Sequence, residues 1–464
     1  MRVLLIRPNS KMRTTFLPLG MGYIADAVRK AGHEVSILDA RRERLSSSAV
    51  VDAVKKINPA VIGLSAMHFE KHGLKAVAKD IKGAGISTPL VLGGPLVSTS
   101  GAELVQEGIV DIAVVGEGEL KFNQYIESLE GKGGLEAIPG MIFRHNGEII
   151  LNDPGPFIEN LDEGMLAWDL IEPDRYYTRF GRATQNTLAR SYKRASIFTS
   201  RGCPFGCIYC HNVFGKKFRS RSPESVLGEI SLLVKEYGIE ELEIVDDCFN
   251  LDLDRAKKIA KGIRDLNYGL HIVFSNGLRA DRMDEELIDL LKEAGTYRIN
   301  YAVETASPRL QKFVRKNLDL DRTQDVIAYT ASRGIFTFGY FMMGFPTETE
   351  DEMRMTIDYA IRSKFHAASF FYVNPFPGTE LARQFPVDIS ISDNINHMDY
   401  SDLKVNLSEV SDEKLRQLRK EAYRKLHFAP DRVWRTFRVV PKNHRTVWAV
   451  GITGLLAIRD IGNW

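Results

Sequence analysis

The sequence predicts an α/β chain with an amino-terminal doubly wound domain, a partial (β/α)6 barrel and a small, mainly helical carboxyl-terminal region. Two patterns predict this arrangement. Short apolar runs alternate with helical patterns over residues 1–118, and a strand–helix unit recurs about six times over residues 195–385. A chain of 464 residues is also too long for one hydrophobic core. We expect domains over residues 1–135, 191–390 and 391–464, with a connector over 136–190.

The first domain is predicted to be flavodoxin- or Rossmann-like. Its expected helices include Gly22–Ala31 and Leu74–Gly83, and its expected strands are Val3–Ile6, Glu34–Leu38, Val61–Ser65, Leu90–Leu92 and Ile112–Val115. Ligands of such sheets bind beyond the carboxyl ends of the strands. Small or polar residues stand there, namely Asn9, Ser65, Met67, Gly93, Gly94, Pro95, Gly116, Glu117 and Gly118.

The connector is predicted to contain a β-hairpin. Met141–Arg144 and Glu148–Leu151 would pair across Asn146-Gly147, a dipeptide that favours a tight hairpin turn.

The second domain is predicted to be an incomplete barrel. Its expected strands are Ala195–Thr199, Glu241–Val245, His271–Phe274, Arg298–Val303, Phe336–Met342 and Ala368–Val373, and its expected helices are Pro223–Tyr237, Leu253–Leu266, Asp284–Ala294, Thr323–Arg333 and Glu350–Lys364. Chemistry in barrels is found at the carboxyl ends of the strands. The residues that follow these strands are a cysteine loop, Asp246, Asp247, Ser275, Asn276, Glu304, Gly344 and Asn374.

The carboxyl-terminal region combines a charged amphipathic helix, Glu409–His427, with a basic and aromatic tail, Arg432–Trp464. The tail includes an uncharged stretch, Thr446–Ile458. Two interpretations stay open: a helix that packs over the barrel mouth, or a segment that lies at a membrane surface.

Composition excludes several classes of protein. Lys+Arg is 62 against Asp+Glu 60, so no general electrostatic attraction to nucleic acid is expected. Neither a signal peptide nor an apolar run of about 20 residues is present, which predicts a cytoplasmic chain. Three of the 4 cysteines lie close together, which indicates a metal site instead of a disulfide scaffold.

The clustered cysteines are Cys203, Cys207 and Cys210 in the pattern Cys-x3-Cys-x2-Cys. Thiolates favour iron–sulfur clusters or zinc. Three thiolates on a [4Fe–4S] cluster leave one iron open to a substrate. Zinc would require a fourth ligand, and His211 is poorly placed to supply it; zinc and a chance cluster stay the minor alternatives.

This loop, with Tyr209 before its last cysteine, resembles the signature of the radical S-adenosylmethionine (SAM) superfamily. The resemblance implies a [4Fe–4S] cluster whose open iron binds SAM, and reductive cleavage of SAM to a 5′-deoxyadenosyl radical.

Further segments carry the same resemblance. Ile244–Asn250 resembles the segment that holds the SAM ammonium, with Asp246 and Asp247 as acceptors. Tyr301–Thr305 resembles the Gly-x-Glu-Ser segment, with Ala302 in place of glycine, and Phe341–Glu348 resembles the glycine motif near the adenine. The SAM residues implied are Tyr209, Asp246, Asp247, Ser275, Asn276, Glu304, Gly344 and Asn374. No catalytic residue is assigned. Cys248 is expected to be a neutral packed thiol, and the alternative is that it faces the site.

The amino-terminal domain resembles the cobalamin-binding branch of that superfamily. Pro89–Pro95 contains its Gly-Gly-Pro pattern, Val114–Glu119 its Gly-Glu-Gly-Glu pattern, and Pro18–Ala25 its helix start. The cobalamin residues implied are Asn9, Leu19, Gly20, Ser65, Met67, Gly93, Gly94, Pro95, Gly116, Glu117 and Gly118. The axial-histidine motif Asp-x-His-x-x-Gly is missing; His68 and His72 follow the third strand without it, so the resemblance implies a cobalt with no histidine below.

The implied reaction is methyl transfer through methylcobalamin to an unactivated carbon, or less often phosphorus, in which the cofactors carry the chemistry and the protein orients them. A non-methylating cyclase or rearranging enzyme is the alternative, and a corrinoid or iron–sulfur sensor without turnover is a third. Implied partners are a small-molecule, lipid, tetrapyrrole or peptide substrate and an electron donor such as flavodoxin or ferredoxin. Peripheral membrane contact through the tail is a further hypothesis.

Overall fold

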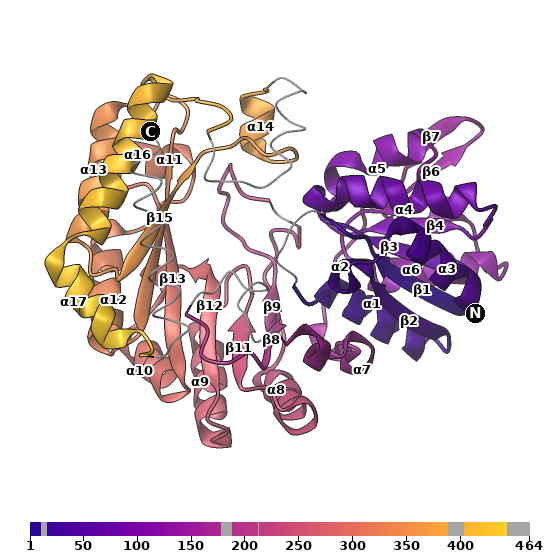
Figure 1. Cartoon of the computed structure of the whole chain (residues 1–464), viewed down its shortest axis with the longest axis horizontal. Helices are drawn as coiled ribbons and strands as arrows, with labels where there is room; N and C mark the ends of the chain where they lie inside the picture. The colour runs from indigo at the N-terminus through magenta and orange to yellow at the C-terminus, as the bar shows by residue number, and fades with distance from the viewer. Residues whose placement is uncertain (11–15, 178–187, 212, 388–402, 443–464) are drawn as a thin grey trace. The chain divides into compact units, whose positions relative to one another are not determined.

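The computed structural model describes residues 1–10, 16–177, 188–211, 213–387 and 403–442 (Figure 1). They form two compact units. Unit 1 comprises Met1–Thr184 and the segment His211–Arg219, and unit 2 comprises Gln185–Cys210 and most of the chain from Ser220 onward. Parts of the predicted connector and the predicted boundary near residue 390 lie outside the described residues, so the division into four segments stays a prediction.

Unit 1 is built on one seven-stranded sheet with the order β2-β1-β3-β4-β5-β6-β7. The pairs among the first five strands are parallel, and β6 and β7 form an antiparallel hairpin that extends the sheet. The strands are β1 (Arg2–Arg7), β2 (Glu34–Asp39), β3 (Val61–Ser65), β4 (Leu90–Gly93), β5 (Ile112–Val114), β6 (Met141–His145) and β7 (Glu148–Leu151). The predicted doubly wound sheet and the predicted hairpin are therefore confirmed.

Helices cover both faces of this sheet. They are α1 (Leu19–Lys30), α2 (Ala40–Glu43), α3 (Ser47–Ile57), α4 (Lys71–Gly83), α5 (Val97–Gln106), α6 (Glu119–Leu129) and α7 (Trp168–Ile171). Leu4 and Ile6 of β1 belong to a core cluster with α3, α4 and α5, whereas Val3 and Leu5 belong to one with α1 and α6. Burial on both faces explains why β1 is an unbroken apolar run without alternation.

Unit 2 is built on a six-stranded sheet with the order β15-β14-β13-β12-β11-β8, in which every pair is parallel. The strands are β8 (Arg194–Ile197), β11 (Glu241–Ile244), β12 (His271–Leu278), β13 (Thr296–Glu304), β14 (Phe336–Met343) and β15 (Ala367–Tyr372), and a short ribbon joins β9 (Ser200–Arg201) and β10 (Arg219–Ser220). Within the described residues β8 and β15 are edge strands, so the predicted partial barrel is confirmed.

The described helices of unit 2 begin where side chains cap them, except the last one, which follows Ala429 without a side-chain cap. They are α8 (Pro223–Tyr237), α9 (Leu253–Leu266), α10 (Glu285–Glu293), α11 (Pro308–Phe313), α12 (Leu320–Ser332), α13 (Glu350–Arg362), α14 (Glu380–Gln384), α16 (Asp412–His427) and α17 (Pro430–Val439). Asp252 accepts a hydrogen bond from the Arg255 N–H, and Thr349 and Glu352 form a capping box at α13. Such caps satisfy N–H groups that have no partner inside the helix.

Strand β12 is longer than the sequence predicts. It runs four residues past Phe274, with a register shift against β13 and a positive φ of 93° at Gly277. This irregularity keeps the chain in the sheet where the apolar pattern ends. Ser275 and Asn276 therefore lie inside the strand, and the prediction that they follow it is wrong.

Helix α17 lies at the amino-terminal end of β15, away from the barrel mouth. The buried Arg432 guanidinium donates to the carbonyls of Phe365 and Ile361, and the Thr436 hydroxyl donates to the His366 carbonyl at 3.0 Å. A tail packed over the mouth is thus wrong for Pro430–Val439. The stretch Thr446–Ile458 lies outside the described residues. No helix in the described part of the chain is long and apolar enough to span a bilayer.

Candidate functional site

The cysteine loop of unit 2 is anchored by the apolar residue at its centre. Ile208 is fully buried against Leu310, Val314 and Phe345. Its N–H donates to the Val314 carbonyl at 3.2 Å, and its carbonyl accepts from Leu381 N–H at 2.8 Å. With Ile208 fixed on both sides, Cys203 and Cys207 keep partly exposed positions. The loop therefore presents its thiols from a rigid base.

The donor set of the loop, three thiols from one short segment, fits an iron–sulfur cluster. Within the described residues no three His, Cys, Asp or Glu side chains converge on one metal ion. A tetrahedral zinc with Zn–S bonds of about 2.3 Å would draw its thiolates to within roughly 4 Å of one another. Cluster thiolates bind separate iron corners and stand farther apart. Arg279 and Lys316 are close enough to the thiols to interact electrostatically with thiolates.

Cys248 lies beside this loop as a buried thiol. It is 4% exposed, and a hydrogen bond with Cys203 together with burial raises its pKa well above the ordinary range. A neutral thiol next to Cys203 can donate to a cluster ligand. Cys248 is thus both packed and adjacent to the site, which combines the two interpretations that the sequence left open.

The two aspartates after β11 have different surroundings. Asp246 is buried, and its carboxylate accepts from Thr199 N–H at 2.6 Å and from the Ser200 hydroxyl at 2.6 Å. Asp246 thereby ties β11 to the start of the cysteine loop. Asp247 has an exposed side chain at the same strand end. Of the two, Asp247 is the better candidate acceptor for an ammonium group; both roles stay predictions.

Glu304 is held in a strained conformation at the end of β13. Its φ is 70°, which a side chain other than glycine rarely adopts. Its carboxylate is 3.6 Å from Lys316 Nζ and hydrogen-bonds the Tyr209 phenol, and burial raises its pKa. The structure thus brings Tyr209 and Glu304, two of the predicted SAM residues, into contact.

The other predicted SAM residues have separate partners. Asn276 Nδ2 donates to the Val245 carbonyl at 2.6 Å, and the Ser275 carbonyl accepts from Asn300 Nδ2 at 2.9 Å. Asn374 is 2% exposed, and its Oδ1 has no hydrogen-bond partner among the described residues. An orphaned buried acceptor at the end of β15 fits a polar ligand, because leaving such a group unpaired costs about 1–3 kcal/mol.

Gly344, at the end of β14, is stabilised by a buried carboxyl. Glu348 Oε2 accepts from Gly344 N–H at 2.6 Å and from Phe345 N–H at 3.0 Å. Burial nevertheless raises the pKa of Glu348 to about 8. Gly344 itself has a φ of 96°, which explains the glycine.

This raised pKa predicts a pH effect on stability. The folded chain binds the Glu348 proton more tightly than the unfolded chain, so the free energy of unfolding should fall as pH rises from about 4.5 to about 8 and then level off. Glu348→Gln keeps an acceptor for both N–H groups and removes the titration. We expect it to remove a fall of about 5 kcal/mol, measured by urea unfolding across pH. Glu236→Gln, on the exposed side of α8, is the control; equal slopes in all three proteins would contradict the assignment.

In unit 1, the predicted cobalamin residues after β3 and β4 lie together. Ala66 N–H donates to the Gly93 carbonyl at 3.3 Å, and Leu96 N–H donates to the Ala66 carbonyl at 3.1 Å. A Cβ on Gly94 would lie 2.9 Å from the Ala66 oxygen, whereas a Cβ on Gly93 would meet nothing within 4 Å. The turn therefore packs tightly on one side and leaves open space on the other, a cradle for a bound ligand.

The remaining predicted cobalamin residues differ from one another in their surroundings. Gly20, at the start of α1, also has open space around a hypothetical Cβ, while Leu19 is buried. Asn9 Nδ2 donates to the Leu45 carbonyl at 3.1 Å. Glu117 is buried in an ion pair with Arg219 at 2.8 Å and accepts from Ile158 N–H. Because the Glu117 carboxylate is already paired with Arg219, we expect the Gly116–Gly118 turn to contact a ligand through its backbone atoms.

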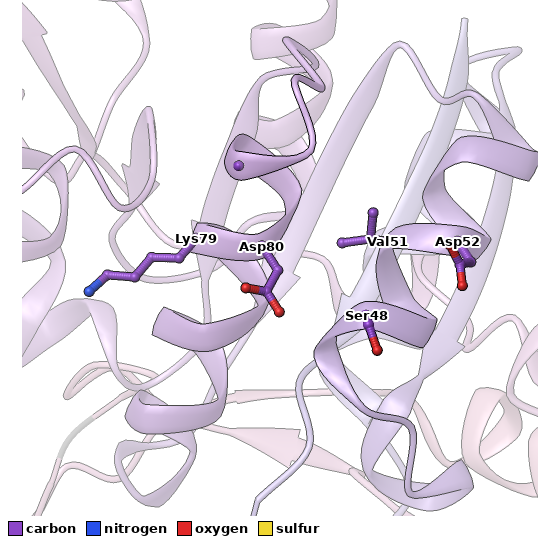
Figure 2. Close-up of a pocket in the computed structure, with 6 residues that line it drawn as sticks. Ser48, Val51, Asp52, Lys79 and Asp80 are labelled. Carbon is purple, nitrogen blue, oxygen red and sulfur yellow. The ribbon is translucent and has the colours of Figure 1, made fainter.

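A surface hollow of about 300 Å³ lies elsewhere in unit 1, between α3 and α4 (Figure 2). It is lined by Ser48, Val51, Asp52, Lys79, Asp80 and Gly83. Figure 2 shows Lys79 pointing away from α3. None of the predicted site residues lines this hollow, so it is a groove between two surface helices.

Comparison with known proteins matches both units to families. Residues 197–360 match the radical SAM superfamily, and residues 9–126 match the B12 binding domain. The chain is 30% identical over 470 residues to the uncharacterized methyltransferase PH0819 of Pyrococcus horikoshii, covering 99% of this chain and 98% of that protein. It is also 30% identical to cytidylyl-2-hydroxyethylphosphonate methyltransferase of Streptomyces wedmorensis, covering 82% and 81% of the two chains.

The chain is a cobalamin-binding member of the radical SAM superfamily. A solved structure of TsrM from Kitasatospora setae, with cobalamin and a [4Fe–4S] cluster bound, has the same fold, with a TM-score of 0.68 and 20% identity over 82% of this chain and 74% of that one. This radical SAM protein is therefore an enzyme whose cofactors are a [4Fe–4S] cluster, SAM and cobalamin.

In this radical SAM enzyme, sequence reasoning missed a buried ion network at the carboxyl edge of the unit 1 sheet. Glu70 lies 2.9 Å from both Arg7 and Arg41, and Arg7 lies 3.6 Å from Asp39. Glu70 also accepts from Met67 N–H at 2.8 Å. The network therefore fixes the loop that carries Met67. The only sequence signal was a charged residue at the end of each of two adjacent strands.

Proposed function

We propose that this enzyme transfers a methyl group to an unactivated carbon or phosphorus atom of a small-molecule substrate. The observation that carries the proposal is the pairing of a three-cysteine loop with a glycine-lined sheet edge in a chain that matches a methyltransferase over 99% of its length. When bound, the cluster supplies the electron that cleaves SAM to a 5′-deoxyadenosyl radical, and cobalamin carries the methyl group.

The residues of unit 2 would bind and orient SAM. The three cysteines would hold the cluster and leave one iron for the SAM amino and carboxylate groups. Asp247 offers an exposed carboxylate for the ammonium, and Asn374 offers an unpaired acceptor at the barrel mouth. Glu304, held by Lys316 and Tyr209, would accept a hydrogen bond from a further polar group of SAM. The protein's part is orientation and exclusion of water.

Cyclisation is a less favoured alternative. An anaerobic magnesium-protoporphyrin IX monomethyl ester cyclase of Cereibacter sphaeroides is 23% identical, and the match covers 65% of that enzyme. The methyltransferase relatives are more similar and match over more of their length. They favour methyl transfer, and the substrate of the S. wedmorensis enzyme makes phosphonate nucleotides the first acceptors to test.

The decisive assay uses SAM with a trideuterated methyl group. Anaerobic enzyme with all three cofactors, a reductant such as reduced flavodoxin or ferredoxin, and candidate acceptors should yield a product that carries the labelled methyl together with 5′-deoxyadenosine. A product that forms without the label would favour cyclisation or rearrangement. Absence of 5′-deoxyadenosine under every condition would favour the sensor hypothesis.

We further propose that α17 contacts an anionic membrane surface. Val433, Trp434 and Phe437 are each more than half exposed, and the rings of Trp434 and Phe437 stack at 6.1 Å. Arg435, Arg438 and Lys442 lie in the same segment. Aromatic side chains beside basic ones are typical of helices that lie in a bilayer interface.

Flotation with phosphatidylcholine–phosphatidylglycerol vesicles tests this contact. Trp434→Ser with Phe437→Ser should lower the bound fraction about tenfold, because two large apolar side chains no longer enter the interface. Leu151→Ser, at a residue equally exposed in unit 1, should have no effect. A wild-type chain that does not float with the vesicles would contradict the proposal.

A further inference from the structure

The first side chain after β12, Arg279, is a buried cation beside the cysteine loop. It is 8% exposed, and its guanidinium carbon lies 3.9 Å from the centre of the Phe205 ring. Phe205 is the middle residue between Cys203 and Cys207, and all four residues belong to unit 2. The positive charge is therefore stacked on the part of the loop that separates the first two thiols.

Four hydrogen bonds fix the orientation of this guanidinium. Nε and Nη2 of Arg279 donate to the two carboxylate oxygens of Asp281 at 2.9 and 2.7 Å. Nη1 donates to the Lys316 carbonyl at 2.9 Å, and Nη2 also donates to the Asn317 carbonyl at 3.3 Å. A bidentate pair with a carboxylate leaves a planar guanidinium little freedom. Arg279 therefore holds its charge against the loop in one orientation.

The turn that accepts the last two of these hydrogen bonds also supports the cysteine loop. The Val314 carbonyl, at the start of this turn, accepts from Ile208 N–H at 3.2 Å, and the Arg315 carbonyl oxygen lies 3.9 Å from Cys207 Sγ. Two residues of the turn, Arg315 and Asn317, have left-handed backbones with φ of 56° and 47°. Such conformations persist where surrounding contacts hold them. The guanidinium thus contacts the loop directly and stabilises the turn on which the loop rests.

Arg279 differs from Lys316, another buried cation near the thiols, in its partner. Lys316 Nζ is 3.6 Å from Glu304, a predicted SAM residue, so a change there would alter SAM binding as well. Arg279 is paired with Asp281, to which no binding role is assigned. Burial opposes the charge of Arg279, but Asp281 and the neighbouring thiols raise its pKa, so the guanidinium stays charged. Arg279 therefore offers a fixed charge whose effect can be measured separately from SAM.

We propose that Arg279 positions the cysteine loop and raises the reduction potential of the [4Fe–4S] cluster bound there. It rests on the proposed function in one respect, the assignment of the cluster to Cys203, Cys207 and Cys210. An oxidised 2+ core with three thiolates carries one net negative charge, and one electron from an external reductant adds a second without breaking any bond. A positive charge nearby stabilises the more negative state, so reduction becomes more favourable, whereas Asp281 opposes the effect. Arg279 thereby makes the cluster easier to reduce by a donor such as reduced flavodoxin.

A redox titration of the reconstituted full-length protein without SAM tests the proposal. Dithionite and redox mediators set the potential, and the electron paramagnetic resonance signal of the reduced cluster gives the ratio of reduced to oxidised protein. At the wild-type midpoint, Arg279→Gln should lower this ratio about tenfold, and Asp281→Asn should raise it about tenfold. Because both substitutions break the same ion pair, loss of structure would move both ratios in the same direction, whereas loss of charge moves them in opposite directions.

Two further variants separate charge from geometry. Arg279→Lys keeps the charge but loses the bidentate fork, and it should keep the ratio within about threefold of wild type. Arg282→Gln removes an exposed arginine from the same 3-10 helix, Ala280–Arg282, and should leave the ratio unchanged. Iron content shows that each variant holds the cluster. If Arg279→Gln does not hold it, Asp281→Asn decides the proposal by itself.

Each outcome decides the assignment. Shifts in the same direction for Arg279→Gln and Asp281→Asn, an unchanged ratio in Asp281→Asn, or equal ratios in Arg279→Lys and Arg279→Gln would overturn the proposal. A wild-type chain that binds no [4Fe–4S] cluster would overturn it together with the cluster assignment. Absence of methyl transfer from labelled SAM would instead contradict the proposed function alone, because the titration involves neither SAM nor turnover.

Discussion

Replacing Cys207 with alanine is expected to abolish reductive cleavage of SAM, lowering 5′-deoxyadenosine formation by at least ~10³-fold. Two thiolates cannot hold a [4Fe–4S] cluster that also keeps an iron for SAM. Because Cys207 is partly exposed and the loop is anchored through Ile208, the substitution should leave the fold intact. The measurement is 5′-deoxyadenosine after anaerobic reconstitution and reduction, together with iron content.

Cys248→Ala is the matched control. Cys248 is a buried thiol that hydrogen-bonds Cys203 but lies outside the Cys-x3-Cys-x2-Cys pattern, so the variant should bind the cluster and cleave SAM. A Cys207→Ala variant with wild-type iron and turnover, or a Cys248→Ala variant without cluster, would show that the three-cysteine assignment is wrong.

Replacing Glu70 with alanine is expected to destabilise unit 1 by about 3–5 kcal/mol, because it leaves Arg7 and Arg41 buried without their shared carboxylate. It also removes the acceptor of Met67 N–H, so the loop with Met67 and His68 should loosen and cobalamin affinity should fall. Urea unfolding measures the first effect, and absorbance titration with cobalamin measures the second.

Glu103→Ala provides the comparison. Glu103 lies on the surface, where it pairs with Lys71 at 2.9 Å, and its loss should cost at most about 1 kcal/mol. Equal losses of stability in the two variants would mean that the buried network does not stabilise the sheet edge.

Local patterns predicted most of the fold. The apolar run Val3–Ile6 and the capped helix Leu253–Leu266 are specified by neighbouring residues, and both appear where expected. The extension of β12 could not be predicted, since it depends on a register shift against β13. The apolar periodicity of one segment predicts that segment's secondary structure, but it carries no information on the register between two strands.

Some residues of the candidate site could likewise be predicted from the sequence, and the partners of others could not. Cys203, Cys207 and Cys210 were predictable because their spacing is local. The engagement of Glu117 was not, because its partner Arg219 is 102 residues away. The different surroundings of Asp246 and Asp247 depend on Thr199 and Ser200, which come from another strand end. The sequence could name these residue types but not their partners.

The most direct test of the central claim is whether SAM binds to the iron that the three cysteines leave open. Electron–nuclear double resonance of the reduced cluster, with SAM labelled by 15N in its amino group and 17O in its carboxylate, measures this contact. We expect couplings from both labels, which disappear in Cys207→Ala. A reduced [4Fe–4S] cluster without coupling to either label, or a zinc ion in its place, would contradict the account.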